Sequence, residues 1–227
     1  TLDCLRQHGI VIDKEWDGSY RIPGNQHYRS GTYVVEGDYS QAAFWLSAGS
    51  LGRAICCTGL RSKSSQGDEV IVSLIRDMGG QVEGKTELTA CPSELTGRVI
   101  DVEDCPDLVP VLTVLASCAK GITRIIHAGR VRLKECDRLH AMATELNKIG
   151  GDVEEEAEGL IIHGVGRFTG GTVSGWNDHR IAMALAVASQ RCSQLLRIEG
   201  AECVRKSYPE FWQDFQALGG IIQKEGE

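Results

Sequence analysis

Three stretches of the chain are apolar almost without interruption. They read DYSQAAFWLSAGSLG, DLVPVLTVLASCAKG and DHRIAMALAVASQRC, at 38–52, 107–121 and 178–192. Helices that are apolar all round are buried, so we expect these three to lie inside the protein. Each is followed by a short β-like run and then by an amphipathic stretch with helical spacing, near 70–78, 139–149 and 211–218. The alternation predicts an α/β protein.

The same markers recur at a nearly constant interval. Glycines close the amphipathic stretches 70, 71 and 69 residues apart, at Gly9, Gly79, Gly150 and Gly219. Aspartates open the apolar stretches 69 and 71 residues apart, at Asp38, Asp107 and Asp178. Self-similarity at a fixed period indicates a repeat architecture. We interpret each Asp as an N-cap that accepts backbone N–H bonds, and each Gly as a C-terminal cap.

Each repeat is predicted to be a βαβαββ unit. TYVVEG (32–37) and RVIDVED (98–104) fit the opening strand, and GDVEEEAEGLIIHG (151–164) fits the closing pair. Because the apolar helices are buried, the sheets are expected outside three parallel helices, which inverts the usual α/β layering. The repeats are placed at about 36–103, 104–174 and 175–227. Residues 1–35, with a hairpin turning at Asp17–Gly18, match the back half of a unit and are interpreted as the tail of an upstream domain.

Composition and charge narrow the class of function. The chain has 227 residues and a net charge of −7, which argues against a nucleic-acid partner. No apolar run approaches the roughly 18 residues of a membrane span, and the first residues do not resemble a signal peptide. The nine cysteines form no C-x-x-C pair and no zinc-type spacing with histidine. We therefore expect reduced thiols in a cytoplasmic protein, with no metal and no membrane partner.

Four cations stand near expected helix starts in the second and third repeats. They are Lys134 and Arg138 in RLKECDRL, Arg180 in NDHRIAM and Lys206 in VRKSYPEF. A helix N-terminus already attracts anions, so cations at equivalent positions of parallel helices predict one anion-binding face. The alternative is ordinary solvated surface charge.

Carboxylates stand among these cations. Glu135 lies between Lys134 and Arg138, as expected of a general acid–base beside an anionic substrate, or it is a first-turn glutamate favoured by the helix dipole. Asp107 is either part of such a site or a helix cap. His179, next to Arg180, is either a ligand contact or a structural histidine.

Together these motifs resemble the 5-enolpyruvylshikimate-3-phosphate synthase family. The resemblance rests on VEGDYSQAAFWL, SSQGD, CPDLVPVLTVLA, GRVRLKECDRL, WNDHRIAMALAVA and CVRKSYPEFW, and runs the full length of the chain. It implies an inside-out α/β enolpyruvyl transferase-like fold, with two domains of three βαβαββ units, of which this chain resembles the C-terminal part. It also implies transfer of the carboxyvinyl group of phosphoenolpyruvate to the 5-hydroxyl of shikimate 3-phosphate, without a metal or organic cofactor.

The resemblance assigns roles to the residues named above. Asp107 would take the proton from the 5-hydroxyl, and Glu135 would protonate the methylene carbon and later remove a proton. Lys134 would contact shikimate 3-phosphate. The residues that would bind phosphoenolpyruvate are Arg138, Arg180, Lys206 and His179. A planar guanidinium suits this substrate because it binds carboxylate or phosphate through two parallel hydrogen bonds.

Two departures from the family pattern affect these expectations. Arg130 stands where some members have an asparagine that touches the sugar phosphate, so that contact is not assigned. The family's N-terminal substrate-binding groups would lie upstream of Thr1, so we expect about half a site, open to water with splayed cations, and negligible transferase activity without the missing N-terminal domain. The alternatives are a UDP-N-acetylglucosamine enolpyruvyl transferase, which KECDR and NDHR disfavour, and a non-catalytic module that binds phosphorylated anions.

Overall fold

The computed structural model describes residues 1–224, and the chain divides into two compact units, Thr1–Glu36 and Gly37–Glu227. The first contains helix α1 (Leu2–Gln7) and an antiparallel hairpin of β1 (Asp13–Lys14) and β2 (Tyr20–Arg21). Gly18 lies between the strands with φ of 86°, a conformation that glycine adopts without steric cost. The expected hairpin is therefore present, and its assignment to an upstream domain stays a prediction.

The second unit alternates helices with short strands. Its helices are α2 (Tyr39–Leu51), α3 (Ile71–Asp77), α4 (Val109–Cys118), α5 (Arg138–Lys148), α6 (His179–Ser189) and α7 (Phe211–Ala217). Its strands are β3 (Ile55–Cys57), β4 (Gln81–Glu83), β5 (Leu88–Cys91), β6 (Val99–Asp101), β7 (Ile122–Ile126), β8 (Asp152–Glu156), β9 (Gly159–His163), β10 (Gly171–Ser174) and β11 (Leu196–Glu199). Short 3-10 helices precede α3, α4, α5 and α7, at Gly67–Val70, Pro106–Leu108, Gly129–Leu133 and Ala201–Lys206.

The strands form three small sheets that follow the repeats. The orders are β3-β5-β4, β6-β7-β9-β8 and β10-β11. Strand β6 is parallel to β7, β10 is parallel to β11, and the other pairs are antiparallel. The second repeat is thus a complete βαβαββ unit, and RVIDVED supplies its opening strand as predicted. Pairing with β11 groups β10 with the third repeat.

The prediction of an opening strand at TYVVEG is wrong. Residues 32–37 form no strand, and Val34 and Val35 are 95% and 91% exposed. A strand needs a neighbouring strand to satisfy its backbone N–H and C=O groups, and no strand of the described residues pairs with this segment. In the third repeat no strand follows α7 as far as residue 224, so the described residues lack its closing pair.

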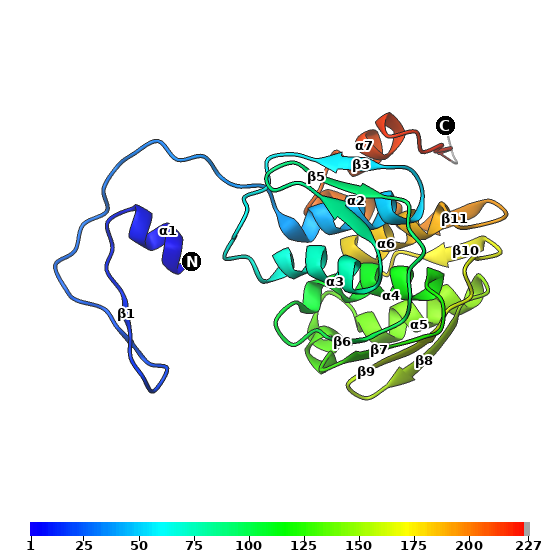
Figure 1. Ribbon diagram of the computed structural model, residues 1–227, viewed down its shortest axis with the longest axis horizontal. Helices are drawn as coiled ribbons and strands as arrows, with labels where there is room; N and C mark the ends of the chain where they lie inside the picture. Colours follow the sequence, from blue (N-terminus) through cyan, green and yellow to red (C-terminus); the bar gives the residue numbers. More distant parts are fainter. Residues whose placement is uncertain (225–227) are drawn as a thin grey trace. The chain divides into compact units, whose positions relative to one another are not determined.

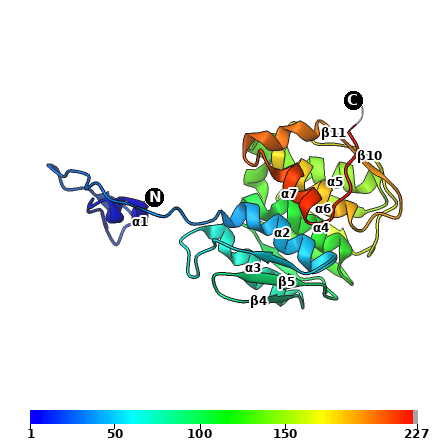
Figure 2. The same ribbon diagram turned by 90° about the horizontal axis from the view of Figure 1, so that it is seen from above.

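Helices α2, α4 and α6 pack against one another inside the second unit (Figures 1 and 2). Their N-terminal ends meet, because Arg180 Nη2 donates to Ser40 Oγ (3.0 Å) in α2 and to Asp107 Oδ2 (3.3 Å) before α4. At the other end, Arg191 beyond α6 donates to the carbonyl of Leu51, the last residue of α2 (3.5 Å). The three helices therefore run parallel, and each carries the sheet of its own repeat on its outer side. The inside-out α/β fold is confirmed.

Local capping explains where most of these helices end. Asp38 and Asp178 cap α2 and α6, accepting from the N–H groups two residues later at 2.8 and 2.9 Å. The glycines that follow α3, α5 and α7 have left-handed φ of 93°, 89° and 99°, as helix-terminating glycines do (Gly79, Gly150 and Gly219). The prediction that Asp107 is also a cap is wrong, because its side chain makes no capping bond. No helix in the described part of the chain has both the length and the apolar character to cross a bilayer.

Candidate active site at the helix N-termini

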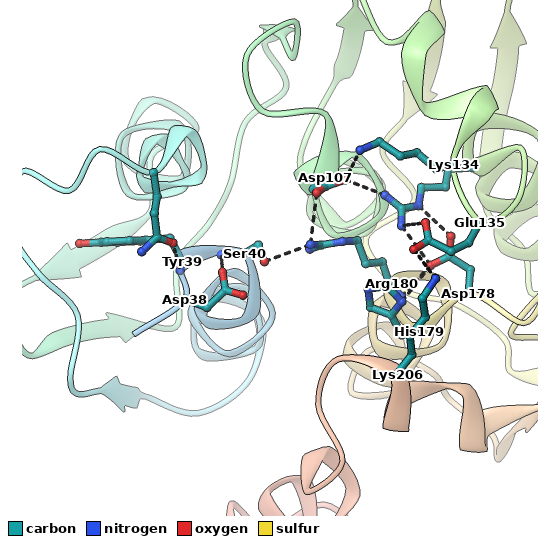
Figure 3. Close-up of polar contacts among 12 residues, drawn as sticks. Asp38, Tyr39, Ser40, Asp107, Lys134, Glu135, Asp178, His179, Arg180 and Lys206 are labelled. Atoms are coloured by element: carbon teal, nitrogen blue, oxygen red, sulfur yellow. Dashed lines mark hydrogen bonds and ion pairs between the residues drawn. The ribbon is translucent and has the colours of Figure 1, made fainter. Parts of the chain in front are cut away.

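One guanidinium joins three carboxylates where the buried helices begin. Figure 3 labels these carboxylates, Asp107, Glu135 and Asp178. Arg138, the first residue of α5, is 1% exposed. Its Nε donates to Asp178 Oδ2, its Nη1 to Asp107 Oδ1 and its Nη2 to Glu135 Oε2, each at 2.8 Å. A buried charge is stable only when paired and hydrogen-bonded, and three carboxylates meet that need here.

Asp107 connects this guanidinium to two further cations. Lys134 Nζ lies 3.2 Å from its Oδ1, and Arg180 Nη2 lies 3.3 Å from its Oδ2. Arg180 also reaches Ser40 Oγ on the neighbouring helix, as the dashed line in Figure 3 shows. The carboxylate of Asp107 thus joins the second repeat to the third, and Arg180 extends the connection to Ser40 of the first repeat.

Lys206 reaches the cluster from the third repeat. Its Nζ donates to Glu135 Oε1 at 2.7 Å, while Glu135 holds Arg138 with its other oxygen. Beside this pair lies a surface hollow of about 520 Å³, lined by Glu135, Asn177, Glu202, Cys203 and Lys206. A small anionic molecule in this hollow would meet both a flexible ammonium and an ionised carboxylate.

The cations control the ionisation of the carboxylates. Burial acts to raise the pKa of Glu135, but the hydrogen bond from Lys206 and the charges of Arg138 and Lys206 lower that pKa to about 2. Burial likewise acts to raise the pKa of Asp107, and Arg180, Arg138 and Lys134 hold it below its ordinary value. Burial would lower the pKa of Arg138, but its three carboxylate partners raise it. Both candidate acid–base groups are therefore ionised at neutral pH.

Two buried nitrogen atoms lack hydrogen-bond partners among the described residues, Arg180 Nη1 and His179 Nδ1. His179 Nδ1 lies 3.9 Å from Asp178 Oδ1, beyond hydrogen-bond distance. Burial, and then the charge of Arg180, lower the pKa of His179, which keeps the imidazole neutral at neutral pH. A buried donor without a partner is costly, so Arg180 Nη1 marks a place for an acceptor from a ligand.

The structure brings the predicted site residues to one end of the helices. They are Asp107, Lys134, Glu135, Arg138, His179, Arg180 and Lys206. Arg138 and Arg180 stand in the first turns of α5 and α6. Lys134 directly follows the 3-10 helix that precedes α5, and Lys206 is the last residue of the 3-10 helix that precedes α7. The expectation of splayed cations open to water is wrong for the two arginines, whose side chains are 1% and 10% exposed, because the carboxylates hold them inside.

Sequence reasoning missed two contributors from the first repeat. Ser40 accepts from Arg180, although nothing in its local sequence distinguishes it from other first-turn serines. Asp68, in the 3-10 helix before α3, lies close enough to Arg180 and Asp107 to feel both charges. Burial raises the pKa of Asp68 to about 6, with the charges of Asp107 and Asp38 adding to the rise against the opposing effect of Arg180. The sequence feature that could have identified Asp68 is its place in the motif SSQGD.

Buried parallel helices, outer sheets and this cluster of charges define an enolpyruvyl transferase fold. A solved structure of EPSP synthase from Acinetobacter baumannii superimposes with a TM-score of 0.87 at 27% identity, over 96% of this chain and 54% of that one. Residues 1–215 match the family described as EPSP synthase (3-phosphoshikimate 1-carboxyvinyltransferase), and the chain belongs to this family.

Curated relatives support the same assignment. The chain is 52% identical over 225 residues to a 3-phosphoshikimate 1-carboxyvinyltransferase of Clostridium kluyveri, and 50% identical over 224 residues to one of Clostridium acetobutylicum. Each match covers 99% of this chain, and 53% and 52% of the relatives. The chain therefore spans about half the length of these relatives.

Proposed function

We propose that this chain supplies the C-terminal half of a site that transfers the carboxyvinyl group of phosphoenolpyruvate to the 5-hydroxyl of shikimate 3-phosphate. The observation that supports this most is the position of Asp107 and Glu135 on a shared guanidinium, Arg138, at the helix N-termini. A module that only captured anions would gain nothing from carboxylates in its binding face, because they compete with the ligand for the same cations.

Phosphoenolpyruvate fits the cations because it carries a carboxylate and a phosphate. Arg180 Nη1 is buried and has no hydrogen-bond partner among the described residues, so its N–H is unused. Lys206 is 57% exposed and is accessible to an incoming anion. Lys134, which contacts Asp107 from the other side, would meet the phosphate of shikimate 3-phosphate. The neutral imidazole of His179 offers one further hydrogen bond without adding charge.

The acid–base step follows from what substrate binding does to Glu135. A substrate carboxylate that takes the Lys206 ammonium removes the hydrogen bond that lowers the pKa of Glu135, and burial then raises that pKa. Glu135 can thus hold a proton for the methylene carbon of phosphoenolpyruvate. Meanwhile Asp107 accepts the 5-hydroxyl proton as the hydroxyl oxygen bonds to C2. The C2–O bond to phosphate then breaks, and the leaving phosphate takes the proton that Asp107 had accepted. The new methyl group returns a proton to Glu135, which restores the double bond.

The remaining substrate contacts would come from an N-terminal domain, since the curated relatives are about twice as long as the matched region. We expect residues 1–227 alone to have negligible activity. A cytoplasmic location stays a prediction, in keeping with nine cysteines that are all unpaired in the described residues.

The test is a phosphate-release assay with both substrates. Residues 1–227 are assayed alone and in a chimera that replaces the matching part of the C. kluyveri relative, with the intact relative as positive control. The chimera should turn over and the isolated chain should not. In the chimera, Glu135→Gln should lower kcat by at least 100-fold, because general acid–base groups contribute about 10²–10⁴. The matched control Glu154→Gln, on an exposed β8 carboxylate, should leave kcat unchanged. A folded chimera that binds neither substrate would overturn the proposal.

A further inference from the structure

A buried glutamate lies behind the site, on the helix that begins with Arg138. Glu145 is 0% exposed and stands seven residues after Arg138, two turns along the same face of α5. Its Oε1 accepts from the indole Nε1 of Trp176 at 2.6 Å, and its Oε2 accepts from the backbone N–H of Ser174 at 3.0 Å. Lys148, on the next turn, donates to both oxygens at 2.9 Å.

The turn that Glu145 holds is strained. Trp176 and Asn177 both have φ of 51°, and among the described residues no other consecutive pair of non-glycine residues has positive φ. Asparagine tolerates this left-handed region, but a bulky residue such as tryptophan is a clear outlier there. Residues in this conformation persist only where their surroundings fix them, and they concentrate at functional sites.

This turn leads directly into the site. Asp178 follows Asn177, caps α6 and accepts from Arg138, and the next two residues are His179 and Arg180. Helix α5 therefore holds the segment 174–178 at two points, through Arg138 at one end and Glu145 two turns later. The direction in which α6 presents Arg180 depends on the contacts of both Arg138 and Glu145 with this segment.

We propose that Glu145 is a positioning residue that fixes the Trp176–Asn177 turn and so orients Arg180 for the substrate anion. The proposal rests on the proposed function for the identity of that anion. Because the two donors of the turn use different carboxylate oxygens, an isosteric amide can satisfy only one of them and presents N–H groups to the other. Substitution by glutamine therefore loosens the turn while it conserves side-chain volume.

The experiment titrates phosphoenolpyruvate into residues 1–227 at low salt, with the fraction folded checked by circular dichroism. Glu145→Gln and Trp176→Phe should each raise the dissociation constant about tenfold, as expected if the competent turn is populated about one-tenth of the time. The double variant should bind phosphoenolpyruvate no more weakly than the weaker-binding of the two single variants, because both changes remove the same interaction. Additive losses would contradict the coupling.

Lys148→Met is the matched control. It removes the ion pair from the same carboxylate but no contact with the turn, so it should lower Tm and leave the dissociation constant within about twofold. If Glu145 had a purely structural role, every variant with a lower Tm would also bind phosphoenolpyruvate less tightly, Lys148→Met included. That result would overturn the proposal.

A second readout does not depend on the ligand. In NMR spectra, Glu145→Gln should shift the Arg180 Nε–H and His179 ring signals, whereas Lys148→Met should not. If the unsubstituted chain binds no phosphoenolpyruvate, the proposed function loses support while these signals still decide the role of Glu145. Unchanged Arg180 and His179 signals in a folded Glu145→Gln variant would refute it.

Discussion

Replacing Arg138 by lysine conserves the charge but removes the geometry of the most connected side chain in the cluster. The guanidinium reaches Asp178, Asp107 and Glu135 with separate nitrogens, and its Nη2 makes a further contact with Asp178 Oδ1 at 3.3 Å. An ammonium is a compact point charge on a flexible chain and cannot span three acceptors in different directions. At least one carboxylate therefore loses its hydrogen bond from residue 138. The cost is greatest at Asp178, which is 0% exposed.

The magnitude follows from what is lost. A hydrogen bond to a charged group contributes about 1.5–3 kcal/mol, and removing one partner of a buried pair altogether costs about 3–5 kcal/mol. Lysine keeps part of the attraction, so we expect Arg138→Lys to lower the free energy of unfolding by about 3 kcal/mol. For a unit of this size that corresponds to a fall in Tm of about 6–12 °C.

Urea denaturation followed by tryptophan fluorescence measures this change. Trp45, Trp176 and Trp212 all lie in the second unit, so most of the signal reports the unit that contains Arg138. The matched control is Arg124→Lys, which removes an exposed pair in which Arg124 Nε and Nη2 both donate to Glu156. This change should cost less than about 1 kcal/mol. Equal losses at the two sites would refute the view that burial of the charges sets the cost.

Three other changes probe separate parts of the structure. Lys206→Ala should raise the pKa of Glu135 from about 2, because a hydrogen bond and a nearby positive charge are lost. If an NMR titration of the carboxyl group gave the same pKa in both chains, it would contradict the contact between Lys206 and Glu135. Asp68→Asn should be more stable than the native chain at pH 7 but not at pH 4. Asp68 keeps its proton up to about pH 6 in the folded chain and up to about pH 4 in the unfolded chain. The stability of the native chain therefore falls as the pH rises from 4 to 6. If urea denaturation gave the same stability difference between variant and native chain at every pH, the raised pKa of Asp68 would be ruled out. Gly49→Ala places a Cβ 2.8 Å from the Ala90 carbonyl oxygen, so α2 and β5 must separate. Thermal denaturation should show a free energy of unfolding that is lower by about 1–3 kcal/mol. An unchanged Tm would show that the contact is not tight.

The repeats were readable from the sequence because their markers act locally. A left-handed residue after a helix favours glycine whatever surrounds it, so Gly79 and Gly150 are found where the spacing placed them. An apolar helix must be buried wherever it lies, so the interior could be predicted from three stretches. TYVVEG failed because strand formation requires a neighbouring strand, which a local pattern does not supply.

The site was less predictable because its chemistry depends on partners far apart in the chain. Asp107 occupies the same marker position as Asp38 and Asp178, yet it binds Arg138 and Arg180, 31 and 73 residues away, instead of capping a helix. Glu145 reads as the polar side of an amphipathic helix, and only the fold shows that it faces a strained turn.

The balance of charge in the cluster determines how a ligand can enter it. The cations are Lys134, Arg138, Arg180 and Lys206, and the carboxylates they contact are Asp107, Glu135 and Asp178. Among these groups one positive charge is in excess, and the nearby Asp68 offsets it once that carboxyl ionises above about pH 6. An anionic ligand must therefore displace a carboxylate from its cation. An anion such as inorganic phosphate therefore competes with the carboxylates for the cations and should bind weakly. Its affinity should fall further as the salt concentration rises. A substrate that displaces Glu135 from Lys206 gains the ammonium and, by the same exchange, raises the pKa of Glu135, the residue proposed to deliver a proton to it.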